Sequence, residues 1–240
     1  KIDDTKDETL SIPVYSLYGK TRRPTKEQLT DIDVLVYDIQ DIGVRFYTYE
    51  STMCAAMEAA AEEGKQFVVL DRPNPIDGIT IEGPTLDAGR ESFVGYQRIP
   101  VRHGMTIGEL AVMFAKERQL EVDLVVVKME NWRRSDNWFN TGLTWINQSP
   151  NMRSPNAALL YTGIGLLETT NVSVGRGTDA PFEMMGAPWI KERELAAAVN
   201  RANPPGVYAV PIRFTPNAVK FPNESCGGLR FVITDWYAFK

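Results

Sequence analysis

The sequence predicts two folded parts, an α/β domain with a mostly parallel sheet followed by a smaller α+β domain. In the first part, apolar runs of strand length at 34–37 and 67–70 flank a helical pattern at 51–63, which is the order of a βαβ unit. After residue 150, a helical pattern precedes strand-like runs without regular alternation. We therefore expect domains at 1–150 and 151–240.

Composition narrows the classes of protein. The chain has 240 residues, of which 43% are hydrophobic, and this is enough for a sizeable core. A net charge of -5 argues against nucleic acid as a partner, because phosphate binding needs clustered Lys and Arg. No apolar run approaches the roughly 20 residues of a membrane helix, and the first residues show no signal-peptide pattern. The sequence leaves the oligomeric state open.

Cysteine and histidine are too few for a typical metal site. Cys54 and Cys226 are far apart and match no metal spacing, and His103 is the single histidine. We expect no metal and no cofactor. Cys54 lies in an Ala- and Met-rich run, which favours a buried free thiol over a long-range disulfide.

The first elements lead to a strand that ends in carboxylates. A short extended segment at 13–19 precedes Thr25 and Gln28, whose spacing is that of a capping box opening a short helix. The run at 34–37 predicts a buried strand, and Asp38 follows it directly. Beyond it, Arg45 and Tyr47 stand among apolar residues, which is unusual for a plain loop.

The helix and strand that follow complete the βαβ unit. Methionine and alanine recur at helical spacing over 51–63, a stripe more typical of a core than of a binding groove, and Gly64 ends it. The strand at 67–70 runs into Asp71. Because ligands collect beyond the carboxyl ends of parallel strands, Asp38 and Asp71 mark one candidate site edge.

Another helix and strand extend the sheet. Thr106 and Glu109 form a capping box for a helix to about residue 118, so Glu109 is better explained as a cap than as a catalytic acid. The continuous apolar run at 122–127 predicts a further buried strand. The tryptophans that follow suit either sugar stacking or a core, and they are Trp132, Trp138 and Trp145.

The second part begins with an apolar helix at 157–168 and a glycine-containing loop at 171–182. A surface helix at 191–202 and strands at 207–214 and 229–234 complete it. Strands that follow helices in this way are typical of a small α+β domain.

The absence of familiar motifs removes whole classes of function. The sequence has no Gly-x-Gly-x-x-Gly after a strand, no phosphate-binding Gly-x-x-x-x-Gly-Lys and no Gly-x-Ser-x-Gly elbow. Acids, arginines, aromatics and one histidine remain. Glu82, between Ile81 and the rigid Gly83-Pro84, is in a setting that can exclude water and raise the pKa of a general acid. The alternative is a solvent-facing residue of an edge strand.

The other candidates also have two interpretations each. His103 either donates to a leaving oxygen or orients a carboxylate, or it is a structural residue satisfied by the helix start. Asp38 and Asp71 either bind substrate hydroxyls or cap helices and pair with Arg45 and Arg72. Arg176, flanked by Gly175 and Gly177, suits a ligand carboxylate, or it fastens a turn to a neighbouring acid.

Taken together, these residues form an ordered series of motifs. The motifs are DIQDIGVRFYTY at 38–49, DRPNP at 71–75, EGP at 82–84, RHGMT at 102–106, SPN at 149–151, GRGT at 175–178 and PF at 181–182. The series runs over nearly the whole chain. It strongly resembles the NamZ family of exo-β-N-acetylmuramidases, long known as a domain of unknown function. Each motif is weak alone, and the combination is specific.

The resemblance implies a Rossmann-like N-terminal domain, a smaller C-terminal domain and an active-site cleft between them. The implied reaction is hydrolysis of a non-reducing terminal N-acetylmuramic acid from peptidoglycan fragments, in a periplasmic or extracellular setting. Glu82 matches the position of the family's catalytic carboxylate, and His103 is expected to act with it in catalysis. The positions expected to bind substrate are Asp38, Arg45, Tyr47, Asp71, Arg72, Asn74, Asn151 and Arg176.

The match also implies that the chain is shortened at both ends. Family chains usually begin upstream of Lys1, with a strand and a Ser-Pro-Glu-His-Gly-type segment, and continue past Lys240. The glutamate of that segment is a candidate for a second catalytic carboxylate. The competing hypothesis is a peptidoglycan-binding module without catalysis, which uses the same cleft and tryptophans.

Overall fold

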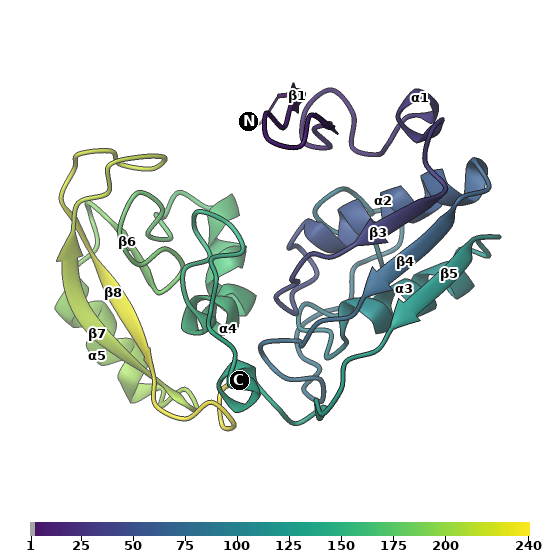
Figure 1. The fold of residues 1–240 in the computed structure, drawn as a ribbon. Helices are drawn as coiled ribbons and strands as arrows, with labels where there is room; N and C mark the ends of the chain where they lie inside the picture. Colours follow the sequence, from purple (N-terminus) through teal and green to yellow (C-terminus); the bar gives the residue numbers. More distant parts are fainter. Residues whose placement is uncertain (1–2) are drawn as a thin grey trace. The chain divides into compact units, whose positions relative to one another are not determined.

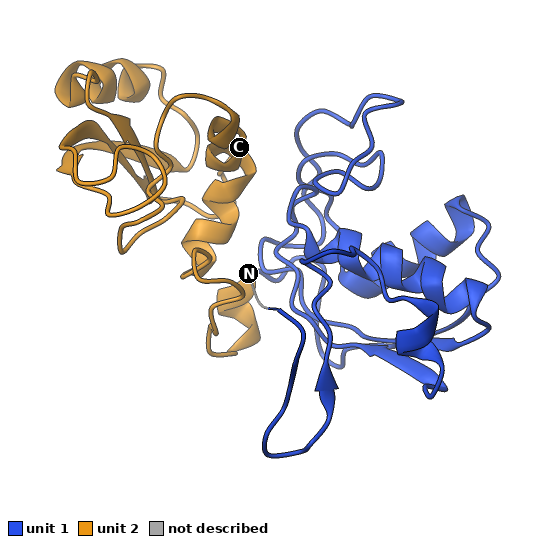
Figure 2. Cartoon of the chain, turned by 90° about the horizontal axis from the view of Figure 1, so that it is seen from above, with its two compact units in different colours: residues 1–137 blue, residues 138–240 orange. Residues whose placement is uncertain are grey.

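The computed structural model describes residues 3–240 and divides into two compact units, residues 1–137 and 138–240 (Figure 2). The sequence places the change of domain near residue 150, whereas the second unit begins at Trp138. Trp138 packs edge-to-face on Trp145, with ring centroids 5.0 Å apart, and Trp145 Nε1 donates to the carbonyl of Met152 at 3.2 Å. These contacts join the tryptophan-rich segment to the second unit.

A three-stranded parallel sheet forms the centre of the first unit, with strand order β3-β4-β5 (Figure 1). Ahead of it lie a two-stranded antiparallel ribbon and a single helical turn. The bounds in the first unit are β1 Thr5–Lys6, β2 Pro13–Val14, α1 Lys26–Leu29, β3 Val34–Tyr37, α2 Tyr49–Glu62, β4 Gln66–Leu70, α3 Ile107–Glu117 and β5 Asp123–Val127. The expected βαβ unit and the strand that follows it are both present.

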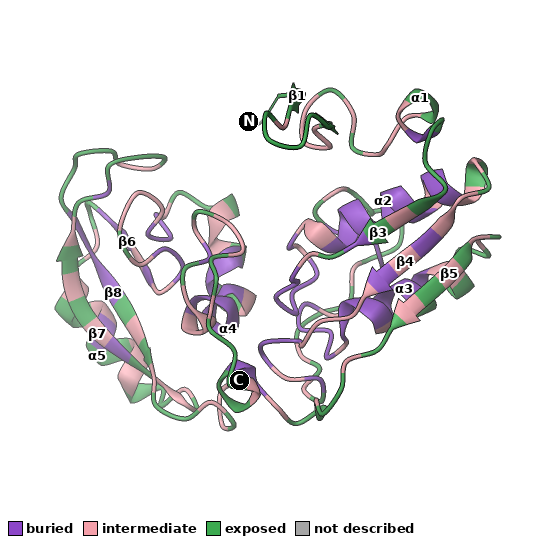
Figure 3. Ribbon diagram, viewed as in Figure 1, coloured by how far each residue is buried: buried purple, intermediate pink, exposed green. Residues whose placement is uncertain are grey.

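Only one face of this sheet is packed (Figure 3). The face toward α2 and α3 holds Tyr37, Phe67 and Val69, all buried. On the other face Val36 is 58% exposed and Val127 49% exposed. The prediction of fully buried strands at 34–37 and 122–127 is therefore wrong. Both are edge strands, and both helices cover the same face of the sheet.

The core of the first unit confirms the interpretation of the Met and Ala stripe. Met53, Met57 and Ala60 of α2 pack against the apolar face of α3, which includes Leu110 and Phe114. Both predicted capping boxes are present, at Thr25 with Gln28 and at Thr106 with Glu109; these four residues bond reciprocally through side chain and backbone. The helix starts therefore follow local chemistry that the sequence displays.

Both cysteines are buried and free. Cys54 is a residue of α2 that lies in the core of the first unit, and Gln97 Nε2 contacts its sulfur at 3.1 Å. Burial raises the pKa of the Cys54 thiol well above its ordinary value. The prediction of a buried free thiol at Cys54 is confirmed.

The second unit is a small α+β unit built on an antiparallel sheet of order β6-β8-β7. Helix α5 packs on this sheet through Ala196, which meets Ala209 and Leu229. The bounds are η1 Trp138–Thr141, α4 Pro155–Ile164, η2 Gly165–Thr169, β6 Met184–Ala187, α5 Glu192–Arg201, β7 Val207–Phe214 and β8 Cys226–Ile233. The chain is thus a mixed α/β protein with a parallel three-stranded sheet and an antiparallel three-stranded sheet near the C-terminus.

Strand β8 is longer than the sequence predicts, because it begins at Cys226 and includes two glycines. Gly228 pairs with Gly186 of β6, and a β-carbon there would lie 2.1 Å from the carbonyl oxygen of Met185. Glycine is required by this close approach of two strands and does not mark a turn. Strand β6, only four residues of Met, Gly and Ala, has no β-branched signal and was not predicted.

Among residues 3–240 no helix has the length and apolar character needed to cross a membrane.

Candidate active site

Three segments of the first unit meet in the loop region between β4 and α3. Arg102 forms antiparallel bridges with both Val44 and Glu82. The backbone N–H of Glu82 donates to the Arg102 carbonyl at 3.1 Å, and the return bond measures 2.9 Å. Arg45 N donates to the Val101 carbonyl at 3.0 Å. This small backbone ladder fixes the position of Glu82 although no long strand contains it.

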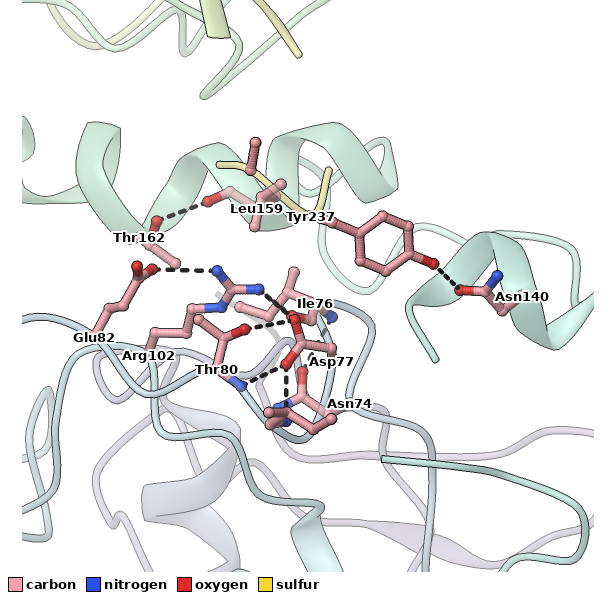
Figure 4. A network of polar contacts seen from close by, with 12 residues as sticks. Asn74, Ile76, Asp77, Thr80, Glu82, Arg102, Asn140, Leu159, Thr162 and Tyr237 are labelled. Carbon is pink, nitrogen blue, oxygen red and sulfur yellow. Dashed lines mark hydrogen bonds and ion pairs between the residues drawn. The ribbon is translucent and has the colours of Figure 1, made fainter. Parts of the chain in front are cut away.

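Arg102 is the centre of the polar network in Figure 4. Its side chain is 2% exposed and pairs with Asp77 Oδ2 at 2.8 Å and with Glu82 Oε2 at 3.2 Å. The guanidinium also donates to the carbonyl of Ile76. A buried guanidinium needs such partners, because an unpaired buried charge is costly. Two carboxylates on opposite sides of Arg102 provide them.

Glu82 combines this ion pair with access to solvent, because its side chain is 31% exposed. The sequence left two settings open, an apolar one that excludes water and a solvent-facing one. The structure places the carboxylate beside a guanidinium with part of its surface open to solvent. The ion pair orients the carboxylate without sealing it from solvent, as a base or an electrostatic stabiliser requires.

Asp77 is the residue of this network that sequence reasoning missed. Its Oδ1 accepts from the backbone N–H groups of Ile79 and Thr80, at 2.8 and 2.7 Å, and its Oδ2 accepts from Thr80 Oγ1 at 2.9 Å. Its φ of 76° lies in the left-handed region, which Asp tolerates better than most residues. The Asp77-Gly78 pair is a turn signal that could have found it.

Asn74 is buried and fully engaged in holding this loop. Its Nδ2 donates to the Met105 carbonyl at 3.0 Å, and its Oδ1 accepts from Ile76 N at 3.1 Å. Gly43, with φ at 81°, lies so close that a β-carbon would be 2.4 Å from Asn74 Oδ1. Asn74 therefore ties the loop after β4 to the segment after β3.

The two aspartates at the sheet edge make the contacts that the structural alternative predicts. Arg72 Nε donates to Asp38 Oδ1 at 2.9 Å, in an exposed pair. Asp71 Oδ1 accepts from Gly108 N at 2.8 Å, and its Oδ2 accepts from Thr106 Oγ1 at 2.9 Å. Asp71 thus supports the N-terminus of α3. Burial raises the pKa of the Asp71 carboxyl, and these hydrogen bonds oppose that rise.

A half-open pocket of about 490 Å³ lies beside Asp71, at the carboxyl end of the sheet. Its lining is mostly apolar and includes Val112, Met113 and Trp132, with Glu109 and Lys128 at the polar side. Ligands of parallel sheets collect at this edge. Of the predicted site residues, only Asp71 lines this pocket.

Arg45 and Tyr47 are buried beneath the surface of the same region. Arg45 donates to the carbonyls of Pro84 and Ile99, so it holds the segment that follows Glu82. Burial lowers the pKa of the Arg45 guanidinium. Tyr47 packs edge-to-face on Tyr49, with ring centroids 4.9 Å apart.

His103 is also buried, at 1% exposure. Its Nδ1 accepts from the backbone N–H of Met105 at 3.2 Å, and its Nε2 lies 3.6 Å from Asp41 Oδ2. A ring nitrogen that accepts a hydrogen bond carries no proton, so the neutral ring is protonated at Nε2. This geometry fits the interpretation of His103 as a residue that orients a carboxylate.

Two predicted residues lie in the second unit. Arg176 pairs with Glu168 through two hydrogen bonds, one of them 3.1 Å from its terminal nitrogen to Oε2, and its guanidinium lies 4.8 Å from the centroid of the Phe182 ring. The hydrogen bonds to Glu168 raise the pKa of Arg176. The guanidinium thus fastens a turn to an acid. Asn151 is half buried in the turn before α4.

Within residues 3–240 no group of three or more His, Cys, Asp or Glu side chains is arranged to hold a metal ion.

Comparison with known proteins places the whole chain in one family. Residues 1–156 match the family model described as exo-beta-N-acetylmuramidase NamZ, N-terminal, and residues 159–240 match its C-terminal counterpart. The chain is 50% identical over 229 residues to the peptidoglycan beta-N-acetylmuramidase NamZ of Bacillus subtilis strain 168. That match covers 95% of this chain and 55% of the relative.

Two solved structures of DUF1343 family proteins from Bacteroides fragilis NCTC 9343 are also similar. The match to the first structure has a TM-score of 0.93 at 46% sequence identity. It covers 98% of this chain and 62% of the chain in that structure. The second has a TM-score of 0.75 at 34% identity and covers 94% and 59%. The chain thus spans roughly 55 to 62% of the length of these relatives. The two family models together cover nearly all of its sequence, and the chain belongs to the NamZ family.

Proposed function

We propose that this chain carries the glycosidase site of an exo-β-N-acetylmuramidase, which releases terminal N-acetylmuramic acid from peptidoglycan fragments. The observation that carries the proposal is Glu82, a carboxylate that reaches solvent while it pairs with the buried Arg102. Its support is membership of a family whose models bear this activity in their description. The substrate is a peptidoglycan-derived sugar.

In this proposal Glu82 acts as a carboxylate. Arg102 orients Oε2 at 3.2 Å, while Asp77 holds Arg102 from the other side. A carboxylate so placed can activate water or stabilise the positive charge that develops on the sugar ring in the transition state. Most glycosidases add a second carboxylate, whereas acetamido sugars can use their own N-acetyl oxygen. Either route leaves to Glu82 the same task of electrostatic or base assistance.

Two wider expectations belong to the same proposal. We assign the parallel-sheet unit to a Rossmann-like class, supported by the βαβ order of β3, α2 and β4 and by the site at the carboxyl end of the strands. A periplasmic or extracellular location follows from a peptidoglycan substrate, which lies outside the cytoplasmic membrane. The cleft expected between the two parts stays a prediction.

The alternative is a peptidoglycan-binding module without turnover. It is favoured by the mostly apolar pocket beside Asp71, because Trp132 in its lining suits stacking on a sugar ring. Such a module would bind muropeptides through the same region.

The experiment compares release of N-acetylmuramic acid from a chromogenic muramide and from the muramyl-glucosamine disaccharide. The protein, Glu82→Gln and a matched control, Glu91→Gln in the exposed part of the same loop, are assayed together. We expect turnover in the protein and in the control, and a loss of about 100-fold or more in Glu82→Gln. Saturable binding without turnover, equal in all three proteins and also found when the chain is extended to the length of its relatives, would favour the binding module.

A further inference from the structure

A cluster of buried polar atoms without hydrogen-bond partners comprises residues at the start of α2 and the loop residues Asp41 and His103. Among the described residues, 3–240, no partner is found for Asp41 Oδ1, both oxygens of Glu50, Ser51 Oγ or His103 Nε2. Glu50 is 1% exposed, and Asp41 and His103 are also buried. Buried polar atoms in proteins nearly always have a hydrogen-bond partner. Several atoms without one in the same cluster therefore call for an explanation.

The first step concerns the charge of Glu50. An ionised carboxylate that is sealed from water and accepts no hydrogen bond is strongly disfavoured. The charged groups that act on Glu50 are Asp41, which repels a second negative charge, and Arg45. Arg45 already donates to the carbonyls of Pro84 and Ile99. Burial, reinforced by Asp41, raises the pKa of Glu50 well above its ordinary value. Burial without hydrogen-bond donors therefore favours the neutral, protonated form of Glu50.

The second step asks where the carboxyl hydrogen of Glu50 goes. His103 cannot accept it, because its Nδ1 already accepts from Met105 N and its Nε2 carries the ring proton. Ser51 is the next residue of the helix, and adjacent positions do not face each other. Two unpaired acceptors remain near this helix end among the described residues, Asp41 Oδ1 and Gln97 Oε1. Of these, Asp41 is the group whose charge acts on Glu50, and a carboxylate is a stronger acceptor than an amide oxygen.

We propose that Glu50 is a positioning residue, a neutral acid that donates its hydrogen to Asp41 Oδ1 and so holds the Asp41 carboxylate in place. Asp41 Oδ2 accepts from Gly43 N at 2.7 Å and faces His103 Nε2 at 3.6 Å. With Oδ1 fixed by Glu50, the Asp41 carboxylate holds both groups at once. It thereby joins the segment after β3 to the segment that carries His103.

The consequence for the candidate site runs along the chain. His103 follows Arg102, whose guanidinium holds Glu82. The neighbouring Val44 and Arg45 form the backbone ladder with 101–102 that fixes Glu82. Glu50 itself is buried, and the route from Glu50 to Glu82 that the proposal describes passes through Asp41 and His103. The proposal concerns where a proton resides, and it stands whether or not the proposed glycosidase function is correct.

Other titratable groups share the environment of Glu50. Tyr37 at the end of β3 and Cys54 one turn along α2 both have pKa values raised by burial, with a smaller contribution from Glu50. Arg45 and His103 face the cluster from the loops. Because Tyr37 and Cys54 titrate only at alkaline pH, a measurement at neutral pH reports the carboxyl groups alone.

Infrared spectroscopy tests the first half of the proposal directly. A protonated carboxyl group has a C=O stretch distinct from that of carboxylates and amides. At pH 7.5, where exposed acids are ionised, we expect this band in the protein. It should shift when glutamate, but not aspartate, is labelled with ¹³C at the side-chain carboxyl. It should vanish in Glu50→Gln and remain in the matched control Glu62→Gln, an exposed acid of the same helix. Absence of the band, or a shift on aspartate labelling, would overturn the proposal.

The single histidine tests the second half. In a chain without an affinity tag, every histidine ring signal in an NMR spectrum belongs to His103. Glu50→Gln keeps a donor to Asp41 and should preserve the ring signals and the Nε2–H tautomer. Glu50→Leu removes the donor at similar volume and should shift those signals and mix the tautomers. Unchanged His103 signals in folded Glu50→Leu would contradict a positioning role. If Glu50→Leu does not fold, Asp41→Asn takes its place: it weakens the acceptor, so the infrared band of Glu50 should shift, and an unmoved band would contradict the hydrogen bond to Asp41.

Discussion

Two clusters of acidic residues in the first unit place their carboxyl groups in opposite environments. Around Arg102, Asp77 and Glu82 share a guanidinium, and Glu82 still reaches solvent. Around Asp41, Glu50 is sealed and has no hydrogen-bond partner among the described residues. The first arrangement pairs a carboxylate with a cation and leaves it accessible, as a reaction requires, whereas the second, in our proposal, holds an acid neutral and fixed, as a positioning residue requires.

The largest expected effect comes from removing the cation of the first cluster. Arg102→Ala leaves Asp77 and Glu82 without their counterion, and breaking a buried ion pair from one side costs about 3–5 kcal/mol. Urea unfolding measures the loss. The matched control is Arg23→Ala, which removes an exposed pair with Glu62 and should cost less than about 1 kcal/mol. Equal losses in the two variants would refute the special status of Arg102.

Next in size is the turn that holds Asp77. Asp77→Ala removes the acceptor of two backbone N–H groups, of the Thr80 hydroxyl and of Arg102. Leaving a buried charged donor partly unpaired costs about 2–3 kcal/mol, so we expect a loss of that order. The folding free energy from denaturant titration gives the value. A change below about 0.5 kcal/mol would show that the loop is held elsewhere.

The cap of α3 should contribute less. Thr106→Ala removes the side-chain acceptor of Glu109 N and the hydroxyl that donates to Asp71. Loss of an N-cap costs about 1 kcal/mol, and the same titration measures it.

The exposed pair of Asp38 with Arg72 is a useful contrast, because Asp38→Asn should cost less than about 1 kcal/mol. If Asp38→Asn weakens muropeptide binding at unchanged stability, Asp38 is a substrate residue after all.

The second cluster is expected to show itself in how stability depends on pH. The pKa of Glu50 is raised in the folded chain, so the folded state binds this proton more tightly than the unfolded state does. Its contribution to stability is present at low pH and is lost as pH rises through the folded pKa. Glu50→Gln should therefore decline less in melting temperature than the protein between pH 6 and pH 9. Parallel curves for the two proteins would contradict a neutral Glu50.

Local chemistry made much of the fold predictable. The capping residues Thr25 and Thr106 and the apolar stripe around Met53 appear in the structure where the pattern placed them. Strand burial was less predictable, because the composition of 34–37 does not reveal whether one face of a sheet or both will be covered. Strand β6 depends on its pairing with β8 and has little signal of its own.

The residues of the candidate site were likewise only partly predictable from the sequence. Glu82, Arg102 and His103 were visible as motif residues, but their partners were not, because Asp77 and Asp41 reach them through loops that only the folded chain brings together. Glu50 did carry a signal that was overlooked. It stands three, four and seven residues before Met53, Cys54 and Met57, which places an acid on the apolar face of α2.

A double-mutant cycle on the rate of N-acetylmuramic acid release tests most directly whether Arg102 acts by holding the Glu82 carboxylate. The protein, Arg102→Lys, Glu82→Gln and the double variant are compared by kcat/KM. We predict that each single change lowers kcat/KM, and that Arg102→Lys costs little further once Glu82 is replaced, because the pair acts as one unit. Fully additive losses would contradict the account, since they would show that Arg102 and Glu82 contribute independently.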